Sequence, residues 1–369
     1  MNTYHFQEED QIPSPALIYY KDTIERNIDK SVEEAGGAGH LWPHVKSHKM
    51  EAVLKLQIQK GITRFKCATM AEARMAAKAG AECVLVAYPL VGPVQDQYLE
   101  LIKQWPECRF YMIADDLDQI RTIAGKAVAA SLQLNLCVDV NTGMNRTGVQ
   151  FKQLKDFCEN VKEIEGIHLA GYHCYDGNRH EKDLSQRKVQ VEKTIREIRE
   201  IAKKDEILIM GGSPTFPVYA EEMKNGRTFY SPGTIFIYDV GYQEQFPDLP
   251  YEPGAAILTR VVSHPADGYF TIDCGYKAVS AEQVYPGILT GVSHCHPAFQ
   301  SEEHWTFQME SGYEKERPVI GQILFVMPWH ICPTTALYGE AIVVEQGIAA
   351  GTWAVSARNR MIGVGTGQI

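Results

Sequence analysis

The sequence lacks several features that mark large classes of proteins. No run of about 18 apolar residues occurs, so we expect no membrane-spanning helix. Its start, MNTYHFQEEDQIPSP, has no basic segment followed by an apolar one, so we expect no secretory signal peptide. The sequence also has no low-complexity segment and no internal repeat. We therefore expect a compact cytoplasmic protein without a membrane partner.

Basic residues are fewer than acidic ones. Lys and Arg number 36 against 46 Asp and Glu, which gives a formal net charge of −10 at pH 7. Proteins that bind nucleic acids are normally basic, so this balance argues against nucleic acid as a partner. The nine cysteines show no C-x-x-C spacing, and Cys67, Cys83 and Cys137 lie inside apolar runs. Reduced, buried thiols are therefore expected rather than a disulfide framework.

What the sequence does contain is an alternation of strand-like and helix-like segments from about residue 15 to 240. Such alternation is typical of parallel strands joined by crossover helices. Its length fits a (β/α)8 TIM barrel of about 250 residues better than an open doubly wound sheet, which is the alternative. The predicted strands are 16–20, 41–46, 65–69, 83–88, 109–113, 132–140, 167–175, 207–211 and 234–239. The predicted helices include 22–34, 71–79 with Thr69 as N-cap, and 182–204.

After about residue 245 the pattern changes to short β-rich runs separated by turn residues, at 256–263, 269–273, 323–327 and 340–345. These runs predict an antiparallel β domain. We therefore predict two domains. The barrel covers 13–245, and the β domain covers 246–369 together with 1–12.

The segment PHVKSHK at 43–49 places two lysines and two histidines within seven residues, directly after Leu41 and Trp42. An amine is a nucleophile only when it is neutral, and burial or neighbouring cations favour that form. A lysine at the mouth of a strand, beside imidazoles, therefore suits carbonyl chemistry. A basic surface turn is the alternative.

Polar residues lie in five loops; four of these follow predicted strands, where the active face of a barrel would lie, and the fifth precedes the run at 234–239. They are Lys46; Asp139, Asn145 and Arg146; His173, Tyr175 and Asp176; Gly211, Gly212, Ser213 and Thr215; and Gly233 and Thr234. The loops GGSPT and SPGT offer unobstructed backbone N–H groups and hydroxyls, which suit a phosphate, although two ordinary turns would read the same. A Schiff-base lysine with a phosphate cradle indicates pyridoxal 5′-phosphate, and Arg146 is a candidate partner of its pyridine nitrogen.

A second pattern lies in MPWHICPTTALY. On an extended strand His330 and Cys332 would share a face, and imidazole with thiolate is a zinc-type ligand pair that leaves positions open for water or substrate. A buried cysteine beside a hydrogen-bonded histidine is the alternative. The HCH motif at 294–296 is a competing pair, and His304 in SEEHWTF is a further candidate.

Nine motifs together resemble the D-threonine aldolase and D-serine dehydratase family. They are PHVKSHK, ATMAEARMAAKAG, VDVNTGMNRTGV, YDGNRH, GGSPTFP, SPGTIFIYD, IDCGYKAVS, SEEH and PWHICPT, in family order from about residue 13 to 340. These are fold-type III pyridoxal-phosphate enzymes with the alanine-racemase-type fold of a barrel and a β domain. The resemblance therefore implies the same architecture, and a homodimer whose partner subunit's β domain completes the active site.

The resemblance also implies roles for individual residues. Lys46, and not Lys49, would carry the cofactor, Arg146 would face the pyridine nitrogen, and Tyr175 would lie beside the ring. The phosphate would be held by Gly211, Gly212, Ser213, Thr215, Gly233 and Thr234. His330 and Cys332 would bind a divalent metal, zinc before manganese or magnesium. His180 would serve as a catalytic base, with His173 or a metal-bound water as alternatives.

Three departures from the family pattern bear on the reaction. The family often has Arg where this chain has Trp42, and often has His where it has Asn178, which leaves His180 as the nearest imidazole. The H-x-C pair is associated with the dehydratase branch, whereas YPLVGP and PTFP resemble the aldolase branch.

The resulting prediction is a metal-dependent lyase of D-β-hydroxy amino acids that cleaves D-threonine-like substrates to glycine and an aldehyde. A D-serine dehydratase that forms pyruvate and ammonia is the first alternative. An amino-acid racemase and a non-catalytic pyridoxal-phosphate carrier are the others. The sequence leaves open whether the reaction is aldol cleavage or dehydration. It also leaves open the side chain of the substrate, the identity of the metal and the residue that acts on the β-hydroxyl as a base.

Overall fold

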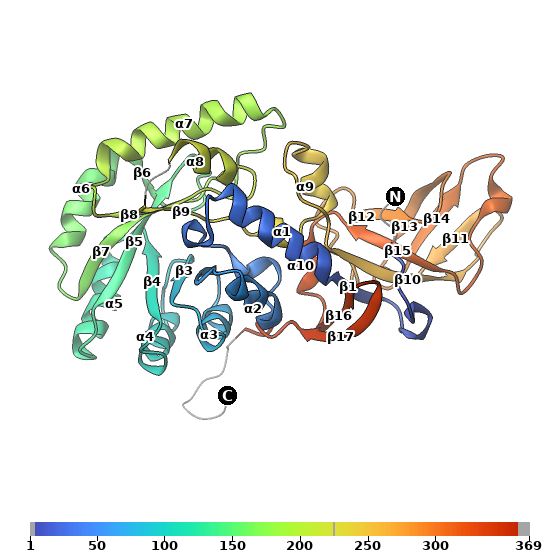
Figure 1. Cartoon of the computed structure of the whole chain (residues 1–369), viewed down its shortest axis with the longest axis horizontal. Coiled ribbons are helices and arrows are strands. Elements are labelled where there is room, and N and C mark those ends of the chain that lie inside the picture. Colours follow the sequence, from blue (N-terminus) through green and yellow to red (C-terminus); the bar gives the residue numbers. More distant parts are fainter. Residues whose placement is uncertain (1–3, 224–225, 361–369) are drawn as a thin grey trace. The chain divides into compact units, whose positions relative to one another are not determined.

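A computed structural model of the chain describes residues 4–223 and 226–360 and divides them into two compact units. The first, here called the barrel unit, contains Ser31–Lys46, Met50–Gly233 and the residues from Ser356 onward. The second, here called the β unit, contains the residues up to Lys30, the short piece Ser47–Lys49, and Thr234–Val355. Figure 1 shows the elements of both units.

The barrel unit is built on a parallel sheet in which strands follow one another in the order β2-β3-β4-β5-β7-β8-β9. Two isolated bridges extend it: Leu41 pairs with Tyr230 in β9, and His44 pairs with Lys66 in β2. Residues 41–44 therefore lie between the two edge strands and close the sheet into an eight-stranded ring. The strands are β2 Arg64–Cys67, β3 Cys83–Val86, β4 Arg109–Ala114, β5 Leu134–Asn141, β7 Ile167–Cys174, β8 Ile207–Met210 and β9 Thr228–Tyr230, with β6 Val149–Gln150 paired to the end of β5.

Seven helices alternate with these strands and flank the sheet in Figure 1, as in a TIM-like barrel. They are α2 Glu51–Gln59, α3 Met70–Lys78, α4 Val94–Gln104, α5 Leu117–Ala129, α6 Phe151–Lys162, α7 Leu184–Ile201 and α8 Phe216–Glu222. The predicted start of α3 is confirmed, because the Thr69 hydroxyl accepts the N–H of Glu72 at 3.2 Å. The Glu72 carboxylate in turn accepts the N–H of Ala68 at 2.7 Å, so two donors at this helix start are satisfied.

The centre of the barrel is packed with side chains. Trp42 is 1% exposed and donates its indole N–H to the carbonyl of Phe65 at 2.9 Å. The rings of Tyr111 and Phe229 meet it edge-on, with centroids 5.2 and 5.3 Å away. The residue that departs from the family pattern therefore fills the apolar centre of the barrel, where its one polar atom finds a backbone acceptor.

The β unit is built on a nine-stranded, largely antiparallel sheet with β10 near its centre. Its apolar core includes Ile18, Leu258 and Phe325. The strands are β1 Ala16–Tyr20, β10 Ala255–Ser263, β11 Tyr269–Ile272, β12 Gly287–Thr290, β13 Cys295–Gln300, β14 Trp305–Met309, β15 Ile323–Pro328, β16 Glu340–Glu345 and β17 Ile348–Ala354. Helix α1 Lys21–Glu34 follows β1, and the short helices α9 Val240–Gln245 and α10 Ile331–Thr335 also belong to this part of the chain.

Two predicted barrel strands are corrected. The segment 16–20 is a strand, β1, but it pairs antiparallel with β10 and parallel with β16, so it belongs to the sheet of the β unit. Its sequence ALIYY is apolar throughout, and such a run fits any central strand equally well. The last barrel strand is β9, not 234–239. Thr234–Phe236 instead forms a 3-10 turn, in which the N–H of Ile237 bonds to the carbonyl of Thr234 at 3.2 Å.

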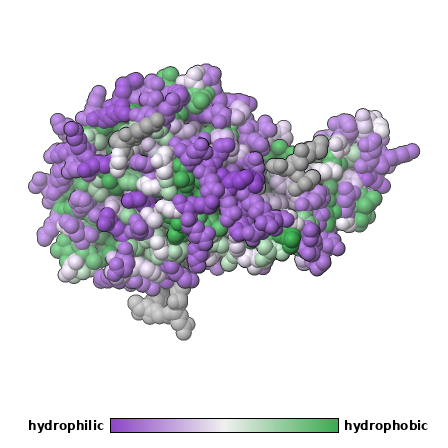
Figure 2. Space-filling view, in the orientation of Figure 1, coloured by the Kyte–Doolittle hydropathy of each residue, from purple (hydrophilic) through white to green (hydrophobic). Residues whose placement is uncertain are grey.

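Apolar side chains are largely inside both units. Figure 2 shows a mostly hydrophilic visible face with smaller hydrophobic areas between. None of the helices in residues 4–223 and 226–360 is both long and apolar enough to cross a membrane.

Gly148 supports the loop that carries Arg146, and it yields a prediction. Its φ is +103°, and a Cβ there would lie 2.5 Å from the backbone nitrogen of Asn141. Gly148→Ala should therefore lower the free energy of unfolding by roughly 2–4 kcal/mol, measured as a fall in the thermal midpoint. Gly125 on α5 is the matched control: nothing lies within 4 Å of its Cβ position, so Gly125→Ala should stabilise by about 1 kcal/mol or less. Equal effects of the two substitutions would contradict this account.

Candidate active site

Three basic side chains lie around the ring of Tyr175 in the barrel unit. The Nζ atoms of Lys46 and Lys66 lie 5.6 and 5.2 Å from the ring centroid, and the guanidinium carbon of Arg146 lies 5.0 Å from it. These distances are typical of cation–π contacts. Lys46 ends the segment that closes the barrel, Arg146 follows β5, and Tyr175 follows β7. The structure thus brings the predicted Lys46, Arg146 and Tyr175 together at one end of the barrel.

Beside this group, a buried dyad joins two adjacent strands. The Nδ1 of His173 on β7 lies 2.7 Å from Oδ1 of Asp139 on β5, and Thr147 donates its hydroxyl to Oδ2 at 2.7 Å. Burial alone would raise the pKa of Asp139, but the bonds from His173 and Thr147 and the charge of Arg146 hold it below its usual value. An ionised Asp139 makes Nδ1 of His173 the donor and leaves Nε2 as the basic nitrogen.

His173 is itself 3% exposed, and its Nε2 has no hydrogen-bond partner among the described residues. Burial lowers the pKa of His173, with Lys66 and Arg146 adding to the effect and Asp139 opposing it. The imidazole is therefore neutral, oriented, and free to accept a proton.

Lys66 was not among the predicted site residues. It lies on β2, is 1% exposed, and faces the same ring as Lys46. Burial, followed by the charges of Lys46 and Arg146, lowers the pKa of Lys66 to about 7. The available signal was a lysine inside the predicted strand 65–69, because lysines are seldom buried without a role.

The two predicted phosphate loops lie side by side after β8 and β9. The N–H of Gly233 donates to the hydroxyl oxygen of Ser213 at 3.1 Å. A Cβ on Gly212 would lie 3.1 Å from the Tyr175 ring, and one on Gly211, whose φ is +75°, would lie 2.8 Å from Tyr219. The bare backbone is therefore a steric requirement of these turns.

Thr215 and Gly212 have structural partners in this arrangement. The Thr215 hydroxyl donates to Oδ1 of Asp176 at 2.7 Å and accepts the N–H of Gly212 at 3.0 Å, while Tyr219 donates to Oδ2 at 3.1 Å. Asp176 is fully buried, and burial raises its pKa although both donors oppose the shift. This network fixes the loop after β7 to the loop after β8. The assignment of Thr215 to the cofactor stays a prediction.

In the β unit, the predicted metal pair adopts a different backbone from the expected extended strand. His330 is the N-cap residue of α10 and Cys332 lies in its first turn. The two side chains are nevertheless close enough to shift each other's pKa, and the hydroxyl oxygen of Thr234 lies 3.4 Å from the Cys332 sulfur. The correction arises because the Asp239 carboxylate accepts the N–H of Ile331 at 3.0 Å, which satisfies a donor at the start of the helix.

The electrostatics of this pair favour a thiolate. Burial alone would raise the pKa of Cys332, but the neighbouring His330 brings it below its usual value. Burial would likewise lower the pKa of His330, yet Cys332, Asp239 and Glu282 raise it to about 9. Glu282 holds Nδ1 of His330 at 2.5 Å, which leaves Nε2 as the nitrogen that can ligate a metal.

Thiolate and imidazole are the donors that zinc prefers, so the chemistry of the pair fits such an ion with two protein ligands. Across the described residues, no group of three or more His, Cys, Asp or Glu side chains is placed to hold a metal. The competing HCH motif is otherwise engaged: His294 stacks on Tyr313 with ring centroids 3.7 Å apart and pairs with Glu310 at 3.1 Å. Metal binding at His330 and Cys332 stays a prediction.

His180, the predicted base, is exposed on the loop after β7. Its neighbour Arg179 donates to the carbonyl of Thr142 at 3.1 Å. Within residues 4–223 and 226–360, no recorded contact links His180 to Lys46 or Tyr175, and its role stays a prediction.

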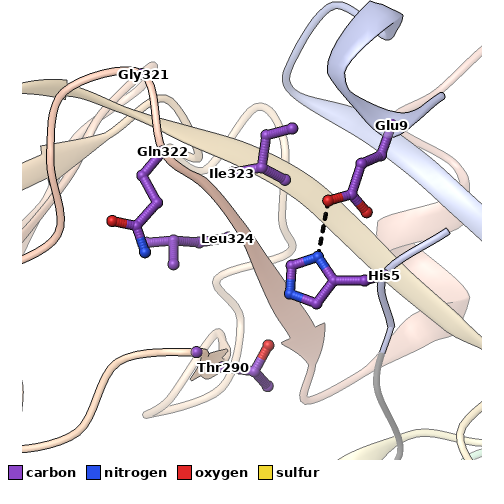
Figure 3. A pocket seen from close by; sticks show the side chains of 8 residues that line it. His5, Glu9, Thr290, Gly321, Gln322, Ile323 and Leu324 are labelled. Atoms are coloured by element: carbon purple, nitrogen blue, oxygen red, sulfur yellow. Dashed lines mark hydrogen bonds and ion pairs between the residues drawn. The ribbon is translucent and has the colours of Figure 1, made fainter. Parts of the chain in front are cut away.

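One cavity lies away from this chemistry. A cavity of about 360 Å³ opens in the β unit (Figure 3), where His5 pairs with Glu9 at 2.8 Å. Its lining residues are His5, Glu9, Thr290, Gly291, Gly321, Gln322, Ile323 and Leu324. A second cavity, of about 10 Å³, is lined by Asp139, Arg146 and Tyr175 among others. We place the candidate site at the second, because charged and basic groups converge there and only one exposed ion pair marks the first.

The barrel, its lysine and its glycine loops define a class. Residues 20–238 match the family model described as "Alanine racemase, N-terminal domain", and residues 254–344 match "Putative serine dehydratase domain". The chain therefore belongs to the alanine racemase N-terminal domain family, the fold-type III pyridoxal-phosphate family, which confirms the predicted resemblance.

Within that family the chain is similar to particular enzymes. It is 25% identical to a D-threonine aldolase of Arthrobacter sp over 94% of this chain and 93% of the relative. It is 26% identical to a 3-hydroxy-D-aspartate aldolase of Paracoccus denitrificans (strain Pd 1222), over 96% and 94%. The crystal structure of D-threonine aldolase from Filomicrobium marinum superposes with a TM-score of 0.84 at 25% identity, covering 95% and 96% of the two chains. The fold is accordingly alanine-racemase-like, as predicted.

Pyridoxal phosphate fits the residues present. Lys46 supplies an amine, the side-by-side turns at 211–215 and 231–234 supply a bare backbone, and Nε2 of His173 is a buried basic nitrogen without a partner in the described residues. A ligand with an aldehyde for the amine, a phosphate for the bare backbone and polar ring substituents for the basic nitrogen would match all three groups.

Lys66 yields a prediction for the ligand-free protein. The pKa of Lys66 is about 7 in the folded state and 10.5 by reference, so between these values only the unfolded state holds the proton. The free energy of unfolding should therefore rise with pH across this window, by at most about 1.4 kcal/mol per pH unit. Lys66→Met removes this pH-dependent contribution to stability. The variant should therefore be more stable than the wild type near pH 6.5 and lose that advantage towards pH 9.5.

Calorimetric melting at several pH values measures the difference. Lys152 on α6 is exposed, so its ammonium stays in water in both states and Lys152→Met should follow the wild type throughout. A difference between Lys66→Met and the wild type that does not change with pH would contradict a neutral, buried Lys66.

Proposed function

We propose that the protein is a pyridoxal-phosphate- and divalent-metal-dependent lyase of D-β-hydroxy amino acids. Its proposed reaction is the retro-aldol cleavage of D-threonine-like substrates to glycine and an aldehyde. The observation that carries the proposal is the convergence of Lys46 and Arg146 on Tyr175 at the barrel end where His173 presents its free nitrogen. The similarity to two aldolases over almost the whole chain supports it.

The chain's residues have distinct proposed tasks. Lys46 anchors the cofactor through its amine, and backbone N–H groups of the two glycine loops bind the phosphate. Arg146 provides a permanent positive charge opposite the pyridine nitrogen. Bound pyridoxal phosphate would supply an electron sink for the bond broken at the substrate α-carbon.

Cleavage also needs a base for the proton of the substrate β-hydroxyl. His180 is the base that the family resemblance suggested, and it is exposed on the loop after β7. His173 has stronger support, because Asp139 fixes its tautomer and leaves Nε2 as a neutral acceptor. We propose His173 as the first candidate and His180 as the second.

The proposed metal ligands are His330 and Cys332. A zinc ion held by these two donors would act as a Lewis acid towards the substrate β-hydroxyl. Manganese and magnesium are weaker candidates, because both prefer oxygen ligands over a thiolate.

Dehydration of D-serine to pyruvate and ammonia is the second candidate reaction. It is favoured by the thiolate character of Cys332 in the H-x-C pair, which the aldolase branch often replaces by H-x-D. In that reaction Lys46 would take the α-proton instead. A racemase is a weaker alternative, since it would leave the thiolate–imidazole pair without a task.

The proposed setting is a cytoplasmic homodimer that acts on a small-molecule D-amino acid and binds neither nucleic acid nor membrane. In it, the active site would be shared between the two subunits. Sedimentation at micromolar concentration should give twice the monomer mass of 41.4 kDa.

A product assay tests the reaction. Purified protein supplied with pyridoxal phosphate and zinc should release acetaldehyde and glycine from D-threonine at a rate at least tenfold above its release of pyruvate from D-serine. The panel should include 3-hydroxy-D-aspartate, because the basic side chains around Tyr175 would also suit a second carboxylate. Pyruvate as the main product would instead favour the dehydratase.

The control for this assay is Lys46. Borohydride reduction of the loaded protein followed by peptide mapping should mark Lys46, and Lys46→Ala should lose the mark and the activity. A label on Lys49 would overturn the assignment of the anchoring lysine.

Metal removal gives a separate prediction. Chelation should lower lyase activity more than tenfold, and zinc should restore it. Cys332→Ser should bind zinc more weakly and show the same loss at limiting zinc. The matched control is Cys295→Ser in the competing HCH motif, which should behave as the wild type. Indifference to chelator would favour the racemase, and a loss in Cys295→Ser alone would move the metal to residues 294–296.

A further inference from the structure

Lys66 is a buried lysine without an acid partner. Its backbone is fixed by the barrel, since its N–H donates to the carbonyl of Pro43 at 2.7 Å and it pairs with Leu85 in β3. Its side chain is 1% exposed and reaches the ring of Tyr175. In the described parts of the chain, no carboxylate lies within ion-pair distance of its Nζ. A charged ammonium in such a place lacks both water and a counter-ion.

The charged groups that face Lys66 come from four neighbouring elements. Lys46 and Arg146 are cations and oppose its charge, while Asp139 and Asp176 are anions and favour it. Both carboxylates already have donors: Asp139 serves His173 and Thr147, and Asp176 serves Thr215 and Tyr219.

Neither carboxylate therefore compensates Lys66 directly. The remaining titratable neighbour, His173, is neutral because burial lowers its pKa, and the charge of Arg146 adds to that effect. The balance at this end of the barrel is an excess of positive charge with one member, Lys66, that can give up its proton.

An anionic ligand would reverse that balance. A phosphate-bearing ring in the same space would attract an ammonium at Lys66 and remove the reason for its neutrality. Lysine can answer in this way because its ammonium loses a proton readily when buried, whereas arginine keeps its charge. A lysine at position 66 can therefore change its charge when a ligand binds, whereas an arginine could not. Arg64, two positions earlier on the same face of β2, contacts the ring of Phe229 instead.

We propose that Lys66 is a positioning residue that adjusts the charge of the site: mostly uncharged in the ligand-free protein at pH 8, it takes up close to one proton when a pyridoxal-type anion binds. The proton comes from solvent and goes to the lone pair of Nζ, and no other bond changes. The inference rests on the proposed cofactor class, and it adds a residue and a proton that the proposed reaction does not require.

A consequence follows for affinity. If binding takes up one proton, the dissociation constant of the ligand increases about tenfold for each pH unit above neutrality until Lys66 is uncharged in the complex as well. A lysine with a purely structural role would leave the affinity without this dependence.

The test uses pyridoxine 5′-phosphate, which carries an alcohol in place of the aldehyde and so cannot react with Lys46. Titration calorimetry at pH 8 in two buffers of different ionisation enthalpy counts the protons exchanged on binding. We expect the wild type to take up close to one proton more than Lys66→Met, and its dissociation constant to rise about tenfold more steeply per pH unit between pH 7.5 and 9. Protons exchanged by the ligand itself cancel in this difference.

Two further variants keep the test decisive. Arg64→Met removes a cation from the same face of the same strand and should keep the proton uptake. Lys66→Arg keeps a permanent charge, so it should bind the ligand without the extra proton, and it replaces Lys66→Met in the comparison if that variant does not fold.

The outcomes separate this inference from the proposed function. Equal proton uptake in the wild type and both Lys66 variants overturns the inference and leaves the cofactor assignment intact. If Arg64→Met also loses the extra proton taken up on binding, the proton uptake depends on the net charge of the site, and the role of Lys66 is overturned. Failure of the wild type to bind pyridoxine 5′-phosphate would overturn the proposed cofactor and the inference together.

Discussion

The concentration of positive charge around Tyr175 is the constraint on which the candidate site depends. Lys46, Lys66 and Arg146 lie within 5.6 Å of one ring, at a place where Lys66 is removed from water. Like charges held this close are stable only if some are neutral or an anion joins them. The ring faces them with its electron-rich surface, and the nearby carboxylates are bonded to other donors. The repulsion between these basic groups destabilises the site without a ligand, and it favours the binding of a phosphate or a carboxylate.

Two buried carboxylates give this site its geometry. Asp139 joins the loop after β5 to His173 on β7, and Asp176 joins the loop after β7 to the loop after β8. Each therefore fixes neighbouring strand ends at the end of the barrel where Tyr175 lies. Gly148, Gly211 and Gly212 allow the backbone to approach within distances that a Cβ would prevent. Rigid strands, buried acids and bare turns thus hold the three basic side chains at one ring, and within residues 4–223 and 226–360 no ion pair joins any of them to a carboxylate.

Much of this could be predicted from the sequence, and the errors have physical reasons. The alternation of strands and helices predicted the barrel, and the β-rich runs predicted the antiparallel sheet, because period and turn residues report local structure. The strand at 16–20 was assigned to the wrong sheet, since an apolar run does not say which strands it pairs with. The H-x-C pair was expected on a strand but lies at a helix start, because Asp239, far away in the sequence, caps that helix. Lys66 was missed because its burial depends on strands that lie elsewhere in the chain.

The residues and their order by themselves determined the type of fold and the chemistry that its loops can offer. The sequence alone supplies these functional groups: an amine in PHVKSHK, an arginine in VDVNTGMNRTG and two glycine turns. The tertiary structure alone decided which of those groups meet, which are buried and which are already bonded. Barrel closure through Leu41 and His44 brings Lys46 and Lys66 to one ring, and burial then sets the charge that Lys66 carries. Charge state depends on the dielectric surroundings of a side chain, and those surroundings exist only once the chain has folded.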